Sequence, residues 1–219
     1  FVDLDFDFNF YGDDYNQILV NPNGWIGFGD NDNQWSNETI PSDDGPQNAI
    51  FAFWDDLNPQ NENNSCSNEG QGDVYHATIE NKKIIWFNDV VRCGSNPDYE
   101  GVFDFQVVLH NNKSIDINYR TMDGYTTSAT IGIQNNNGSD GILITYNDEY
   151  VHDNLKLTFK PNSQWLTPIN DSNTLYYGEQ AIYDVEVDSN QLNSSSEVSY
   201  ILIESNSNES NIVVPINVS

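Results

Sequence analysis

Oxygen-bearing side chains gather where two predicted strands end. Asp55, Asp56 and Asn58 follow directly after an apolar run, and Asp30 and Asp32 follow a shorter one. Ca²⁺ in proteins takes about six to eight oxygen ligands from Asp, Asn and backbone carbonyls. If the two strands end at the same edge of a sheet, the two loops converge on one ion, and a calcium site is expected there.

The same residues also suit a simpler role. Asp and Asn side chains in turns accept hydrogen bonds from nearby backbone N–H groups, and such turns need no metal. The spacing is not that of an EF-hand, because the Gly and the distal Glu of that loop are missing. A calcium site and self-capped polar turns therefore both remain open.

Catalytic residues show no recognisable arrangement. None of His76, His110 and His152 accompanies a Ser or Cys in a strained, Gly-flanked turn. Carboxylate pairs of the kind that cleave glycosides are present, but a chain with 34 Asp and Glu residues contains such pairs by chance. We therefore expect no enzymatic activity.

Two cysteines, Cys66 and Cys93, flank a predicted hairpin. Its strands, residues 72–80 and 83–88, bring both cysteines to roughly the same end. A disulfide is expected, and it implies an oxidising compartment. The alternative is two free or metal-binding thiols, which no CxxC motif or neighbouring His supports.

The chain is strongly acidic, with 7 Lys and Arg residues against 34 Asp and Glu and a formal net charge of -27. Nucleic acid is excluded as a partner because phosphate contacts need Lys and Arg. The acidity favours cations or a salty medium, or it serves solubility alone. No stretch approaches the ~18 apolar residues of a membrane-spanning helix, so no membrane insertion of this segment is expected. Because the chain does not begin with Met, we expect a mature or excised segment.

Alternation of apolar and polar residues predicts many short strands. In residues 2–10 the apolar side chains occupy every second position and Asp or Asn fills the others. Sustained helical periodicity is missing, so we expect an all-β fold built as an antiparallel β-sandwich. The other strands are predicted at residues 16–20, 25–29, 50–54, 72–80, 83–88, 102–110, 114–120, 128–134, 142–146 and 155–159.

The composition changes near residue 160, where aromatic residues become rarer and Ser and Asn more frequent. We expect one domain over residues 1–160 and a smaller Ig-like β-sandwich over residues 161–219. The second is short for a fold that usually takes about 100 residues, so a missing strand is an open alternative. Its strands are predicted at residues 164–168, 174–177, 181–188, 198–204 and 211–218.

Aromatic residues divide into two groups. Trp25, Trp54, Trp86 and Phe105 are assigned to the core. The others lie in loops or near strand ends, where a ring beside Asn or Asp is the way sugar sites are built. The alternative is that these rings close the ends of the sandwich. They are Trp35, Tyr99, Tyr125, Tyr150, Tyr176 and Tyr177.

The chain also contains acceptor triplets for N-glycosylation, Asn-x-Ser/Thr. A chain rich in Asn and Ser forms such triplets by chance, and modification requires a host with the machinery. The candidate acceptors are Asn37, Asn63, Asn112, Asn137, Asn170, Asn193, Asn208 and Asn217.

A series of motifs runs through the first domain in a fixed order. They are FNFYG at 8–12, NPNGWIGFG at 21–29, NAIFAFWDDL at 48–57, GDVY at 72–75, IIWFNDV at 84–90, FDFQVVL at 103–109 and SATIGIQN at 128–135. Together they resemble the nidogen-type extracellular domain of large secreted and surface proteins, over nearly all of residues 1–160. One departure is Ala52, where relatives often carry Pro. YDVEV at 183–187 and VVPI at 213–216 are similar to the small Ig-like repeats that accompany such domains.

The resemblance implies a non-catalytic adhesion or structural module of a cell-surface or secreted protein. Its partners would be other copies of itself, or other surface proteins and glycans. A first alternative is a filament subunit in which residues 1–10 donate a strand to a strand-deficient sandwich of the next copy. A second alternative is an accessory carbohydrate-binding region of a secreted hydrolase.

Overall fold

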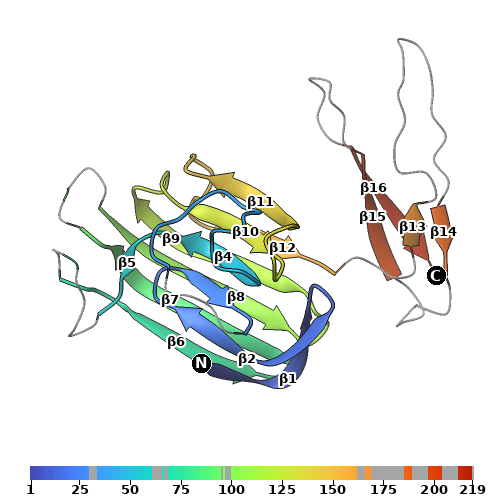
Figure 1. Ribbon diagram of the computed structural model, residues 1–219, viewed down its shortest axis with the longest axis horizontal. Helices are drawn as coiled ribbons and strands as arrows, with labels where there is room; N and C mark the ends of the chain where they lie inside the picture. Colours follow the sequence, from blue (N-terminus) through green and yellow to red (C-terminus); the bar gives the residue numbers. More distant parts are fainter. Residues whose placement is uncertain are drawn as a thin grey trace, which may run out of the picture. The chain divides into compact units, whose positions relative to one another are not determined.

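The computed structural model describes residues 1–29, 34–60, 66, 69–94, 96, 100–161, 166–168, 185–188, 197–203 and 212–218. The described residues form strands, turns and loops, and the expected all-β fold is confirmed (Figure 1). The chain divides into two compact units, Phe1–Lys160 and Pro161–Ser219. Each unit is described by itself.

The first unit contains two antiparallel sheets arranged as a sandwich. The strand order of the first sheet is β1-β2-β3-β4-β10-β11. The bounds of its strands are β1 (Val2–Phe10), β2 (Asp13–Asn21), β3 (Trp25–Gly27), β4 (Ala49–Trp54), β10 (Thr130–Gln134) and β11 (Gly141–Tyr146).

The second sheet has the order β12-β9-β8-β7-β5, and β6 also pairs with β7. Apart from the two-residue β5, which the sequence pattern does not predict, its strands overlap the predicted ranges, and β7 and β9 each run four residues further than predicted. The bounds are β5 (Leu57–Asn58), β6 (Asp73–Ile79), β7 (Lys82–Arg92), β8 (Gly101–His110), β9 (Ile115–Gly124) and β12 (Lys156–Phe159).

The edge strand β1 has the predicted alternation, with Leu4 and Phe8 completely buried in the core. A bulge around Asp5, whose φ is 63°, interrupts its pairing with β2. The Asp5 carboxylate accepts a hydrogen bond of 2.5 Å from Thr78 Oγ1 of β6 and lies 3.8 Å from Lys83 Nζ of β7. These contacts join the edge of one sheet to the edge of the other.

Strand β4 is buried on both faces, which explains its uninterrupted apolar sequence. Ile50 and Phe53 belong to the core between the sheets, whereas Phe51 and Trp54 pack with Trp25 in a second apolar cluster. All six residues of β4 are 0% exposed. The strand is therefore fixed from both sides before it ends at the acidic pair.

The segment 34–48 covers this second cluster. Two polar side chains of β10, both completely buried, hold it by hydrogen bonds to its backbone. Thr130 Oγ1 donates to the carbonyl of Glu38 at 2.6 Å, and Gln134 Nε2 donates to that of Pro46 at 2.9 Å. Because these two carbonyls are satisfied, the backbone at Glu38 and Pro46 packs beside apolar side chains without an unpaired carbonyl.

Two antiparallel strand pairs make up the described part of the second unit. They are β13 with β14 and β15 with β16. The strand predicted at residues 174–177 lies outside the described residues, and the Ig-like assignment stays a prediction. The bounds are β13 (Leu166–Pro168), β14 (Val185–Val187), β15 (Glu197–Ile203) and β16 (Ile212–Val218).

Candidate functional site

Asp55 connects the two sheets at the end of β4. Its carboxylate, 3% exposed, accepts a hydrogen bond of 2.9 Å from Arg92 Nε of β7 and another from Ser128 Oγ. Its second oxygen accepts a hydrogen bond of 2.8 Å from the backbone N–H of Asp56. A buried charge needs such a set of partners. The ion pair between Asp55 and Arg92 thus joins the end of β4 to β7, a strand of the opposite sheet. This ion pair is called the ionic fastener below.

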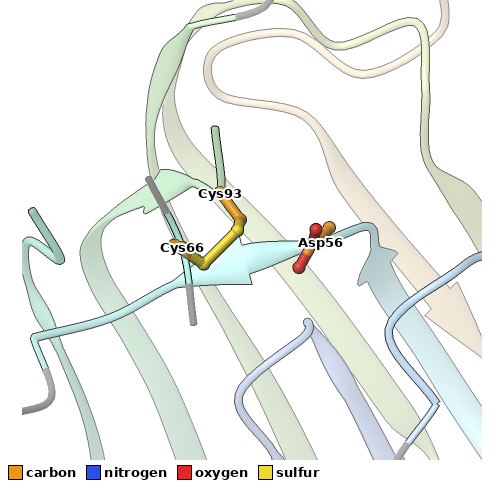
Figure 2. Close-up of side chains that lie close together, drawn as sticks. All are labelled: Asp56, Cys66 and Cys93. Atoms are coloured by element: carbon orange, nitrogen blue, oxygen red, sulfur yellow. A yellow bond between two sulfur atoms is a disulfide. The ribbon is translucent and has the colours of Figure 1, made fainter. Parts of the chain in front are cut away.

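The predicted disulfide between Cys66 and Cys93 is present beside this fastener, and the Asp56 carboxylate lies next to it (Figure 2). The backbone N–H of Cys93 donates to the carbonyl of Asp56 at 2.7 Å. Partial burial raises the pKa of Asp56, the negative charge of Asp55 adds to this, and Arg92 opposes it. Cysteine binds metals as a thiolate, and both sulfurs here are used in the disulfide. The carboxyl group of Asp56 and these two sulfurs therefore do not form a metal site.

The strand directions bear on the calcium prediction. Trp25 pairs with Phe51 and Gly27 with Ala49, so β3 and β4 are antiparallel. Their C-terminal ends therefore lie at opposite ends of the sheet. The calcium prediction required the two strands to end at the same end of the sheet, and this requirement is not met. That part of the prediction was wrong.

The structure places the individual calcium candidates as follows. Asp55 is bound to Arg92, and Asn58 is 1% exposed within β5. Asp56 lies against the disulfide (Figure 2). Asp30 and Asp32 lie outside the described residues, so calcium binding by these carboxylates stays a prediction.

A second charged cluster surrounds Asp116 of β9. Its carboxylate lies 3.0 Å from Lys156 Nζ and 2.8 Å from His110 Nε2, and Thr158 Oγ1 donates to it at 2.7 Å. Burial by itself would raise the pKa of Asp116, but the hydrogen bonds from Thr158, Lys156 and His110 outweigh it and hold the pKa below its ordinary value.

This lowered pKa predicts a dependence of stability on pH. The contribution of Asp116 is fully present above the ordinary pKa of about 4 for an aspartate, and it is lost as the pH falls through the lower pKa of the folded state. Urea unfolding at pH 5 and at pH 2.5 should therefore show a larger loss of stability for the wild type than for Asp116→Asn. An equal loss for the two proteins would contradict the role assigned to this carboxylate.

A row of side chains that the sequence pattern did not single out crosses the outer face of the second sheet. Tyr75, Trp86, Gln106 and Asn118 are direct cross-strand partners on β6, β7, β8 and β9. Direct partners point to the same face of a sheet. The row alternates with side chains that point inward, and these are 0% exposed: Ile85, Phe87, Phe105, Val107 and Ile117.

Trp86 is therefore not a core residue, which corrects the expectation from the sequence. It is partly exposed, whereas Trp25, Trp54 and Phe105 are completely buried as predicted. The segment Ile84-Ile85-Trp86-Phe87 is apolar at every position, so its sequence could not show which face points inward. The pairing of Trp86 with the polar Gln106 is the signal that identifies its face.

The loop aromatics proposed for sugar stacking differ in their surroundings. Trp35 is 60% exposed and Tyr150 is 43% exposed. Arg92 lies over the ring of Tyr125 at 5.8 Å from the centroid, so that ring packs beside the ionic fastener. Tyr99, Tyr176 and Tyr177 lie outside the described residues.

Three glycosylation candidates lie in described loops. Asn112 and Asn137 are exposed in hairpin turns, where the hydroxyls of Ser114 and Ser139 donate to their amide oxygens. The amide nitrogen of Asn37, the atom that would carry a glycan, instead donates to two neighbouring side chains. Glycosylation of all these residues stays a prediction. Asn63, Asn170, Asn193 and Asn208 are not described, and Asn217 lies in β16.

The fold, the disulfide and the ion pairs between strands define the class of protein. It is an antiparallel β-sandwich module with one disulfide among its described residues. The chain belongs to the NIDO-related family, whose model matches residues 1–176 and so extends past the boundary between the two units. No curated protein and no solved structure matches the chain.

Family membership identifies an extracellular module of structural or adhesive type, and such domains are generally non-enzymatic. In the described part of the chain no helix has the length and apolar character to span a membrane.

Proposed function

We propose that the chain is an adhesive module of a cell-surface or secreted protein, which keeps a rigid shape and presents sheet surfaces to other surface proteins and glycans. The observation that carries the proposal is the use of charged side chains to tie strands together. Four of the 7 Lys and Arg residues pair with carboxylates on other strands or strand ends. The first two of the pairs below join the two sheets, and the last two join neighbouring strands of the second sheet. The pairs are Lys83–Asp5, Arg92–Asp55, Arg120–Asp104 and Lys156–Asp116.

Adhesion can be measured with microspheres that carry the purified chain. Coated spheres are expected to attach under flow to surfaces bearing extracellular polysaccharides or matrix proteins. Spheres that carry an unrelated acidic protein of similar net charge serve as the control, because they match the charge without this fold. Equal attachment of the two kinds of sphere, or attachment of neither, would contradict the proposal.

Calcium remains part of the proposal as a stabilising ion bound by carboxylates that include Asp30 and Asp32. The net charge of -27 supports it, since a divalent cation would reduce the self-repulsion. Isothermal titration of the chelator-treated protein with Ca²⁺ tests it, and an absence of binding heat at millimolar calcium would count against it.

Strand donation by residues 1–10 is the alternative function. It requires β1 to leave a core in which Leu4 and Phe8 are completely buried. Asn9 and Asp14 are direct partners on β1 and β2, so Asn9→Cys together with Asp14→Cys would lock β1 onto its own subunit. We expect electron microscopy to show single particles for the wild type and for the locked variant alike. Filaments that form only when the lock is reduced would establish the alternative.

A further inference from the structure

We propose that the outer face of the second sheet binds a neutral polysaccharide along the row formed by Tyr75, Trp86, Gln106 and Asn118. The row is called the aromatic row below. This proposal names the class of ligand to which the adhesive module would bind, and it therefore rests on the proposed function.

The aromatic row is a continuous surface feature. Each residue is the direct cross-strand neighbour of the next, across β6, β7, β8 and β9. Three strand spacings of about 4.8 Å give it a length of roughly 14 Å, which suits a short stretch of an extended sugar chain. Tyr75 is 49% exposed, and the other three side chains are partly exposed. The row therefore faces solvent along its length.

The rings lie at one end of the row and the amides at the other. The ring centroids of Tyr75 and Trp86 are 5.8 Å apart, and their planes are tilted by 45°. Aromatic faces pack against the apolar C–H faces of sugar rings, and planar amides donate to and accept from sugar hydroxyls. The aromatic row offers both kinds of contact within a few ångströms, as sugar sites require.

Trp86 is held in place before any ligand arrives. Its Nε1–H donates to Asp104 Oδ1 at 3.1 Å, and Asp104 in turn lies 2.7 Å from Arg120 Nη2. The guanidinium of Arg120 also lies over the indole at 5.9 Å from the ring centroid. Because the indole is oriented by these contacts, little side-chain entropy is lost on binding. A partly exposed tryptophan fixed in this way is suited to a binding surface.

Local charge favours a neutral glycan over an anionic one. Beside the aromatic row Arg120 lies near both Asp104 and Asp89, and Lys156 pairs with Asp116. The Tyr75 hydroxyl donates to the Asp73 carboxylate at 3.1 Å, so carboxylates outnumber Lys and Arg there. The chain as a whole carries a formal charge of -27, which repels polymers that bear carboxylates or sulfates. The same net charge opposes the packing of a second copy on this face.

Affinity electrophoresis in gels that contain a soluble polysaccharide tests the proposal. The gels would contain a neutral β-glucan, xylan or a chitin derivative, with polygalacturonate as the anionic comparison. The wild type is expected to be retarded in at least one neutral gel and not in the anionic gel. Trp86→Ala and Tyr75→Ala should each weaken the retardation about tenfold, which corresponds to about 1.4 kcal/mol.

The matched control is Tyr146→Ala, which removes a tyrosine of β11 in the first sheet that is 39% exposed and should bind as the wild type does. Tyr75 is more exposed than Trp86, so Tyr75→Ala is expected to fold even if Trp86→Ala does not. Circular dichroism shows whether each variant is folded. Equal retardation of wild type and Tyr75→Ala would overturn the proposal, as would retardation in the anionic gel alone or in no gel.

Two outcomes separate this inference from the proposed function. Spheres that attach under flow while no neutral gel retards the chain would leave the adhesive function standing and refute the aromatic row as a glycan site. Self-association that Tyr75→Ala abolishes, measured by sedimentation velocity, would assign the row to a second copy and also overturn the proposal.

Discussion

Asp55→Ala is expected to lower the free energy of unfolding by about 3–5 kcal/mol, the usual cost of breaking a buried ion pair by removing one partner. The Arg92 side chain, which is 21% exposed, would keep its charge without the carboxylate at 2.9 Å, and Ser128 would lose its acceptor. Urea unfolding followed by tryptophan fluorescence measures the change.

The matched control for this prediction is Asp7→Ala, because Asp7 is an exposed aspartate of β1. Its removal should change the stability by less than about 0.5 kcal/mol. The double variant Asp55→Ala with Arg92→Leu should recover part of the loss, because it leaves no unpaired charge behind. A loss below about 1 kcal/mol for Asp55→Ala would show that the fastener does not hold the sheets together.

Replacing Cys66 and Cys93 together by Ser is expected to cost about 3–4 kcal/mol. The disulfide closes a loop with a sequence separation of 27, and this is the size of the loop-closure entropy that such a cross-link removes from the unfolded chain. For a chain of this length the loss corresponds to a melting temperature lower by about 10 °C. Differential scanning calorimetry of the two proteins measures it.

Reduction provides the control for the disulfide prediction. Wild-type protein in excess dithiothreitol should melt at the temperature of the double Ser variant, and the variant itself should not respond to the reductant. A variant that melts within about 2 °C of the oxidised wild type would contradict the prediction. The Asp56 carboxylate lies within 4.8 Å of both disulfide sulfurs, and the Asp56 N–H donates to Asp55. The two losses should therefore not add in a combined variant.

Strand positions were predictable because they depend on local alternation. Residues 2–10 carry apolar side chains at every second position, and β1 has those bounds. The burial of β4 on both faces likewise follows from its uninterrupted apolar sequence. The nidogen-type motifs, read in order, identified the family that the family model matches.

The site was less predictable because its contacts are distant in the sequence. Asp55 meets Arg92 across a separation of 37 residues and Ser128 across 73, and neither partner is marked by a local pattern. The idea that two acidic loops share one ion required β3 and β4 to end at the same edge, and only the pairing of the strands shows that they do not. Trp86 was wrongly assigned to the core because only its pairing with Gln106 on β8 shows that it lies on the outer face of the sheet.

We propose that the sandwich, held by its ion pairs and disulfide, is a rigid scaffold that presents a binding face. The most direct test of this proposal is the detachment force of single microspheres from an immobilised neutral β-glucan, xylan or chitin derivative. Spheres coated with the wild type and with Tyr146→Ala should need equal force on at least one of these polymers. Spheres coated with Tyr75→Ala and Trp86→Ala combined should detach at the force of uncoated spheres. Equal forces for the wild type and the combined variant would show that the outer face of the second sheet does not bind these polymers.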